Sequence, residues 1–164
     1  EEVECVDCNQ LVYMDLQQAT KVQVESCESL AVVTLPKCVS LTLKHCRMLS
    51  YLSLGTHLKQ LVIDNIDSVA TLRLPRNVRL DRLEIANCSN LTLPNDELVE
   101  ANTIIIRSCP AMSTLEMPIS CIRMSIDNCI NLLSMENFTA NKCLITRCPQ
   151  LDSIHAFSIT LRSL

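Results

Sequence analysis

The chain has 164 residues, of which 48% are hydrophobic but only 2% are aromatic, and its formal net charge is −4. This composition predicts one globular domain with an aliphatic core and excludes intrinsic disorder, which requires low hydrophobicity. The 14 basic residues form no run, which argues against a nucleic-acid partner, because a phosphate backbone needs a clustered cationic surface. No stretch is apolar over the roughly 18 residues that a membrane-spanning helix requires.

The chain contains a single glycine. Tight hairpin turns depend on glycine and asparagine, so a meander of hairpins is not expected. The first residues, "EEVECVDCNQ", have neither a basic nor an apolar region of a signal peptide, and they include no initiating methionine. We therefore expect corners that are made without tight hairpin turns. We also expect the sequence to be a segment of a longer chain.

The cysteines reveal an internal repeat. Seven of them fall on one column, with an isoleucine in the remaining place, at successive spacings of 19, 19, 20, 22, 21, 20 and 19 residues. The column consists of Cys8, Cys27, Cys46, Ile66, Cys88, Cys109, Cys129 and Cys148. A period of about twenty residues is the signature of a repeat protein whose coils stack on one another. Residues 1–164 are accordingly predicted to form one repeat domain of about eight coils.

Around the column the template L-x-x-L-x-L-x-x-C-x-x-L-x-x-L-x-L-P recurs in chain order. It is read in "CVSLTLKHCRMLSYLSL" (38–54), "LKQLVIDNIDSVATLRLP" (58–75), "ANTIIIRSCPAMSTLEMP" (101–118) and "CIRMSIDNCINLLSM" (121–135). The unit at 80–94 is two residues short after its cysteine and is followed by the insert "NDELVE", and residues 156–164 lose the register. The L-x-L alternation predicts two strands in each coil, one before and one after the cysteine.

Prolines mark the expected corners, because proline cannot donate to a strand ladder. Four of them follow the second L-x-L, namely Pro36, Pro75, Pro94 and Pro118, and two follow a column cysteine, namely Pro110 and Pro149. Eight coils at a strand spacing of about 4.8 Å predict a rod or shallow arc about 38 Å long.

The template resembles the twelve-residue conserved segment of leucine-rich repeat proteins, in the short-repeat form of bacteria and protists. The resemblance covers residues 3–155; it departs from the family at Ile66 and where alanine replaces the first leucine, at Ala19, Ala101 and Ala140. It implies a mainly β, right-handed solenoid with a parallel sheet on its concave face. Because the second segment alternates like a strand where longer family members have a helix, we expect little or no helix.

All eleven cysteines fall on inward positions of the template. The four outside the column take slots where leucine, isoleucine or valine stands in other repeats: Cys38, Cys121, Cys143 and Cys5. We therefore expect buried free thiols rather than a metal site or disulfides, and the C-x-x-C spacing of Cys5 and Cys8 has no second pair at zinc-finger distance. The odd count favours a reducing compartment, and so a cytoplasmic location. The sequons at Asn87, Asn90 and Asn137 favour the alternative, a secreted or cell-surface protein.

No catalytic fingerprint is present, no cofactor is implied, and the chain is predicted not to be an enzyme. His45 precedes Cys46, but adjacent residues of a strand point to opposite sides and do not form a nucleophile–base pair. Carboxylates on outward strand positions are more typical of a solvated face than of an acid–base pair.

The resemblance implies that a protein partner binds the outward side of the first strands. The candidate binding residues combine apolar and charged side chains: Lys44, Val62, Asp64, Glu84, Ile105, Arg107 and Leu144. Apolar residues ringed by charge are typical of an interface centre. The preferred prediction is a non-catalytic protein-interaction module. The alternative is a structural or adhesive surface array, with end-to-end self-association through uncapped repeats.

Overall fold

The computed structural model describes residues 1–69, 71–93, 98–116 and 118–161, the last four of these by their backbone alone. No helix occurs in this part of the chain, and hence none that is long and apolar enough to cross a membrane. The strands are β1 (Glu2–Val6), β2 (Tyr13–Asp15), β3 (Lys21–Glu25), β4 (Val32–Leu35), β5 (Ser40–Lys44), β6 (Tyr51–Leu54), β7 (Gln60–Asp64), β8 (Arg79–Ala86), β9 (Val99–Arg107), β10 (Thr114–Leu115), β11 (Ile119–Asp127), β12 (Ser134–Thr146) and β13 (Ser153–Leu161).

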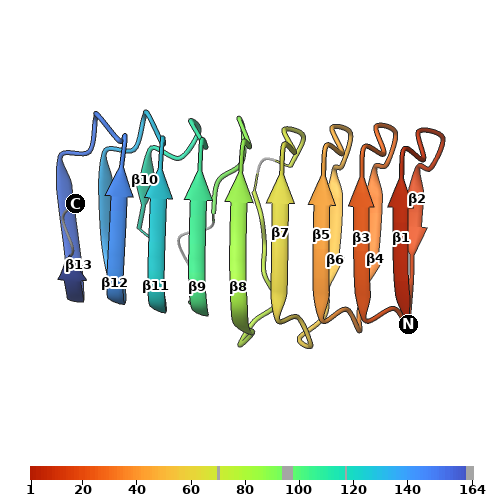
Figure 1. Cartoon of the computed structure of the whole chain (residues 1–164), viewed down its shortest axis with the longest axis horizontal. Coiled ribbons are helices and arrows are strands. Elements are labelled where there is room, and N and C mark those ends of the chain that lie inside the picture. The colour runs from red at the N-terminus through yellow and green to blue at the C-terminus, as the bar shows by residue number, and fades with distance from the viewer. Residues whose placement is uncertain (70, 94–97, 117, 162–164) are drawn as a thin grey trace.

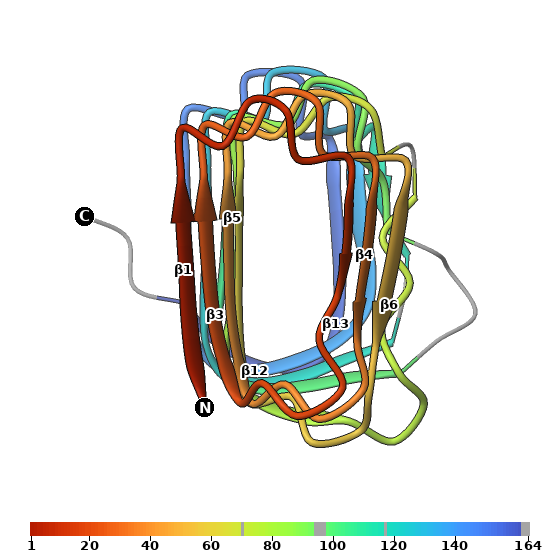
Figure 2. The ribbon, with the colours of Figure 1, turned by 90° about the vertical axis from the view of Figure 1, so that its right-hand side faces the viewer.

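The strands form a parallel β-solenoid of about eight coils, as predicted (Figure 1). One long sheet runs in the order β1-β3-β5-β7-β8-β9-β11-β12, and β10 and β13 also pair with β12. A short sheet of β2, β4 and β6 forms the opposite wall of the first coils, as Figure 2 shows along the stack. The long strand β12 pairs with β10 through its beginning and with β11 further along.

The first corner of each coil is made by a residue in the left-handed conformation. Its φ lies between 50° and 55° in every coil, and it directly precedes the column cysteine or Ile66. These residues are Asp7, Ser26, His45, Asn65, Asn87, Ser108, Asn128 and Arg147. Glycine is the usual residue in the left-handed conformation, and of the other residues asparagine and aspartate adopt it most readily. The chain thus makes this corner eight times without a glycine.

A tight turn completes the first corner. In six of the coils the backbone amide three residues after the column cysteine donates to the cysteine carbonyl, for example from Leu30 to Cys27 at 3.1 Å and from Leu132 to Cys129 at 3.1 Å. The second corner follows β4 at Pro36, as the proline pattern predicts, and the amide of Cys38 donates to the Leu35 carbonyl at 3.4 Å.

The core between the walls is aliphatic. Among the described residues no polar or charged side chain is buried, and leucine, isoleucine, valine and cysteine fill the interior. The eleven cysteines are free, and eight of them are buried: Cys27, Cys38, Cys46, Cys88, Cys109, Cys121, Cys129 and Cys143. Cys5 and Cys148 are partly buried and pack against the core.

Cys8 departs from the expectation, because it is exposed. It belongs to the coil of β1, which pairs only with β3 within the described residues, so its other side is uncovered. The predicted insert also differs in part: Val99 and Glu100 already belong to β9, whereas residues 94–97, including the corner expected at Pro94, lie outside the described residues. The loss of register after Ala156 is confirmed, since β13 pairs with β12 through several register shifts.

The single glycine has a packing role. An added Cβ atom at Gly55 would lie 1.8 Å from the carbonyl oxygen of Pro36 in the preceding coil. The amide of Gly55 donates to the carbonyl of Leu35 at 3.3 Å, and its own carbonyl accepts from Leu58 at 3.4 Å. Gly55 is therefore required by the close approach of two coils at the second corner.

We predict that Gly55→Ala destabilises the fold by about 1–3 kcal/mol, because the methyl group must push the backbone of Pro36 away. Urea unfolding measured against the unchanged chain gives the free energy of unfolding. The exposed neighbour Thr56 supplies the control, and Thr56→Ala is expected to stay within about 0.5 kcal/mol. Equal stability of the two variants would contradict the proposed close contact.

Candidate functional site

The outward residues of the long sheet form continuous rows across the coils. The strand register pairs them one to one, which places each of the seven predicted binding residues beside its neighbours in a row. The first row runs Glu4, Gln23, Thr42, Val62, Glu84, Ile105, Ser125, Leu144. The second runs Val6, Glu25, Lys44, Asp64, Ala86, Arg107, Asp127, Thr146.

The predicted residues differ in exposure. Val62, Asp64 and Lys44 are half-buried, and Leu144 is 36% exposed. Ile105 is only 8% exposed and so presents little of its own surface to solvent. It lies on an interior strand, between Glu84 and Ser125 in the first row.

An apolar hollow lies over the end of the first row. It has a volume of about 350 Å³, and its floor is set by the short side chain of Ser125 between Ile105 and Leu144. Thr103, Arg123 and Lys142 line it along one edge. We call the space that these side chains surround above Ser125 the hollow. Sequence reasoning placed Ile105 and Leu144 on this face but missed the volume left free by a serine between two large side chains.

A third outward row supplies the edge of the hollow. It runs Glu2, Lys21, Ser40, Gln60, Arg82, Thr103, Arg123, Lys142. The sequence contained the signal for this row, because it precedes the first row by two residues in every coil, and alternate strand residues share a face.

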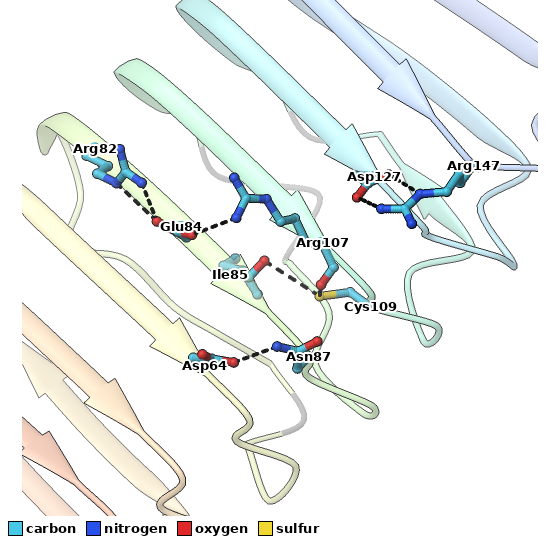
Figure 3. Close-up of polar contacts among 9 residues, drawn as sticks. All are labelled: Asp64, Arg82, Glu84, Ile85, Asn87, Arg107, Cys109, Asp127 and Arg147. Carbon is cyan, nitrogen blue, oxygen red and sulfur yellow. Dashed lines mark hydrogen bonds and ion pairs between the residues drawn. The ribbon is translucent and has the colours of Figure 1, made fainter.

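Two groups of ion pairs hold the charged side chains of the same face (Figure 3). Glu84 accepts from Arg82 at 3.1 Å and lies 3.5 Å from Arg107. Asp127 accepts from Arg147 Nε at 2.8 Å and from the Thr146 hydroxyl at 2.7 Å. Arg82 and Glu84 lie on the same strand. The contact of Glu84 with Arg107 and the contacts of Asp127 bind neighbouring coils to one another across the sheet.

The hydrogen bonds from Arg147 and Thr146 lower the pKa of Asp127 to about 2. A carboxylate with so low a pKa is ionised at neutral pH and is a poor proton donor or acceptor. Asp64 is likewise engaged, since it accepts from the side-chain amide of Asn87 at 2.8 Å. Glu84, Asp127 and Asp64 therefore act as structural partners of neighbouring side chains.

The column thiols are directed at their own strands. Each column cysteine places its sulfur 3.1–3.7 Å from the carbonyl oxygen two residues earlier, as Cys109 does with Arg107 at 3.2 Å (Figure 3). The Arg107 carbonyl also accepts, at 2.9 Å, from the backbone amide of Asn87, the left-handed corner residue of the preceding coil. The thiol therefore uses a second lone pair of a carbonyl that already binds a backbone amide.

Burial keeps the column thiols of the interior coils protonated. Desolvation raises the pKa of Cys109 to about 12 and the pKa of Cys88 to about 11. Because the thiolate is the nucleophile and the metal ligand, thiols with raised pKa values are poorly suited to either role. Among the described residues, no three histidine, cysteine, aspartate or glutamate side chains gather closely enough to hold a metal ion.

His45 and Cys46 point to different sides, as predicted, but the reason is the corner and not strand alternation, because β5 ends at Lys44 and His45 is the left-handed residue. Cys46 is fully buried, whereas His45 is exposed and its Nδ1 atom lies 2.7 Å from the side-chain amide of Asn65. The histidine thus belongs to a surface contact between the first corners of adjacent coils.

Comparison of the chain with models of protein families, with curated proteins and with solved structures finds no match. The description of the fold therefore rests on the strand order and the register alone.

We predict that the Asp127 carboxyl titrates at a pH of about 2 and that Arg147→Gln moves the midpoint up toward the ordinary value of about 3.9. Because the folded-state pKa is lowered, the contribution of this pair to stability is present above about pH 4 and is lost as the pH falls toward 2. Carboxyl chemical shifts in an NMR titration report the midpoint. Arg123→Gln is the control, and a midpoint near 4 in the unchanged chain would contradict the pairing.

Proposed function

We propose that the chain is a non-catalytic protein-interaction module of the leucine-rich-repeat type, which binds a protein partner on the outward face of its long sheet. The observation that carries this proposal is the hollow. It is an apolar depression on a rigid sheet, bordered by charged and polar side chains, and such an arrangement is typical of the centre of a protein interface.

The chemistry of the face favours binding over catalysis. Its carboxylates are held in ion pairs and amide contacts, as for Asp127 with Arg147 and Asp64 with Asn87. The cysteines lie mostly in the interior with raised pKa values. A sheet of fixed strands with paired charges offers a partner a surface that needs little ordering on binding, which lowers the entropic cost of association.

The free thiols support a reducing, cytoplasmic environment. An alternative function is a structural or surface array whose coils associate end to end. Light scattering over a range of protein concentrations distinguishes the two, because an array grows with concentration and a recognition module does not.

We predict that Leu144→Asp lowers the recovery of the partner at least tenfold when the tagged chain is used to capture proteins from cell extract. The charge would stand at the apolar rim of the hollow, where Leu144 is 36% exposed. Mass spectrometry of the captured proteins gives the recovery, and circular dichroism confirms that the fold is kept. Leu144 is preferred to Ile105 for this test because an aspartate at the nearly buried Ile105 would disturb the fold itself.

The matched control is Tyr51→Asp, which places the same charge at an exposed apolar position of the short sheet on the opposite wall. Capture should survive this change. Loss of the partner with Tyr51→Asp and its retention with Leu144→Asp would place the interface on the other wall and overturn the proposal.

A further inference from the structure

The long-sheet face is divided by charge. In its three outward rows, the strands β1, β3, β5 and β7 carry four acids and two bases, whereas β8, β9, β11 and β12 carry four bases and two acids. The first set is Glu2, Glu4, Glu25, Asp64, Lys21 and Lys44. The second set is Arg82, Arg107, Arg123, Lys142, Glu84 and Asp127. A chain whose formal net charge is −4 thus presents a positive half-face.

Two of these cations border the hollow without an acidic partner among the described residues. Arg82 and Arg107 both contact Glu84, but no ion pair joins Arg123 or Lys142 to a described carboxylate. Arg123 and Lys142 are both exposed and lie directly across from each other on β11 and β12. Like charges in that position repel each other and destabilise a sheet. A pair placed this way is stabilised when an anionic group binds between or beside them.

The hollow and the two cations share one geometry. Arg123 lies two positions before Ser125 on β11, and Lys142 lies two positions before Leu144 on β12. Two strand residues span about 6.8 Å. An extended peptide lying along these strands has the same spacing between alternate side chains. When one of its side chains enters the hollow, the side chain two residues away therefore reaches Arg123 and Lys142.

We propose that the hollow binds an extended segment of a protein partner that carries an aliphatic side chain and, two residues away, a carboxylate. The aliphatic group fills the space above Ser125, and the carboxylate binds Arg123 and Lys142. This inference rests on the proposed function and names the chemistry of the partner at the same face. Charge complementarity with the positive half-face selects an acidic segment over a basic one.

The test uses two fluorescein-labelled peptides, Glu-Thr-Leu-Thr-Gly and its reverse, Gly-Thr-Leu-Thr-Glu, so that either chain direction is covered. At least one should shift the backbone amide resonances of Thr103, Ser125 and Leu144 in NMR titrations at low salt. Replacement of its glutamate by lysine, or of its leucine by glycine, should weaken binding at least tenfold. Ser125→Phe, which fills the hollow, should abolish the shifts.

The double variant Arg123→Glu with Lys142→Glu should also weaken binding at least tenfold. Its matched control is Lys37→Glu with Arg47→Glu, which makes the same charge reversal at two exposed positions outside the strands and should leave binding unchanged. The inference is overturned if the lysine peptide binds as well as the glutamate peptide, or if the shifted resonances lie outside the hollow.

The same double variants separate this inference from the proposed function. If partner capture is lost with Leu144→Asp but kept with Arg123→Glu and Lys142→Glu, the proposed interface is supported and the acidic partner segment is contradicted. If capture is kept in both, the proposed function fails as well. Concentration-dependent dimers that the double charge reversal dissolves would identify a second copy of the chain as the occupant and overturn the peptide inference.

Discussion

The first corner of the coil is the constraint on which the rest of the structure depends. At this corner the chain takes one left-handed residue and then turns a small side chain inward, as at Asn87 and Cys88. The inward position is fully shielded in the interior coils, so only a group without unmet hydrogen-bonding demands fits it. Cysteine fits because its weak S–H donor is directed at a carbonyl of its own strand, and Ile66 fits because it has no polar side-chain group.

Because the corner recurs every 19 to 22 residues, it also fixes the register of the long sheet. Each coil places its strand residues directly beside those of the next, so side chains about twenty positions apart become neighbours. The ion pairs of Arg147 with Asp127 and of Arg107 with Glu84 follow from that register. So does the hollow, where the short Ser125 stands between two large apolar residues. The positive half-face has the same origin.

The periodic features could be predicted from the sequence, because inward and outward positions differ in polarity at every coil. The cysteine column, the first strand of each coil, the corners at proline and the outward rows all follow from that alternation. The second strand predicted for every coil is wrong for two of them: among the described residues no strand lies between β7 and β8 or between β8 and β9, where Thr71 and Thr92 form a single bridge. The low exposure of Ile105 and the exposure of Cys8 could not be predicted from the sequence, because both depend on which side chains flank a position. The left-handed corner had a partial signal in Asn65, Asn87 and Asn128, which Ser26 and Arg147 in the same slot obscured.

The central claim is that the interior cysteines serve as buried, reduced packing groups, and a thiol count tests it most directly. Protein prepared without reductant is treated with a thiol reagent in native buffer and again in denaturant. The structure predicts that Cys8 reacts readily in native buffer, that the eight buried thiols do not, and that all eleven react once the chain is unfolded. Thiols that react only after a reductant is added would reveal disulfides and contradict this account.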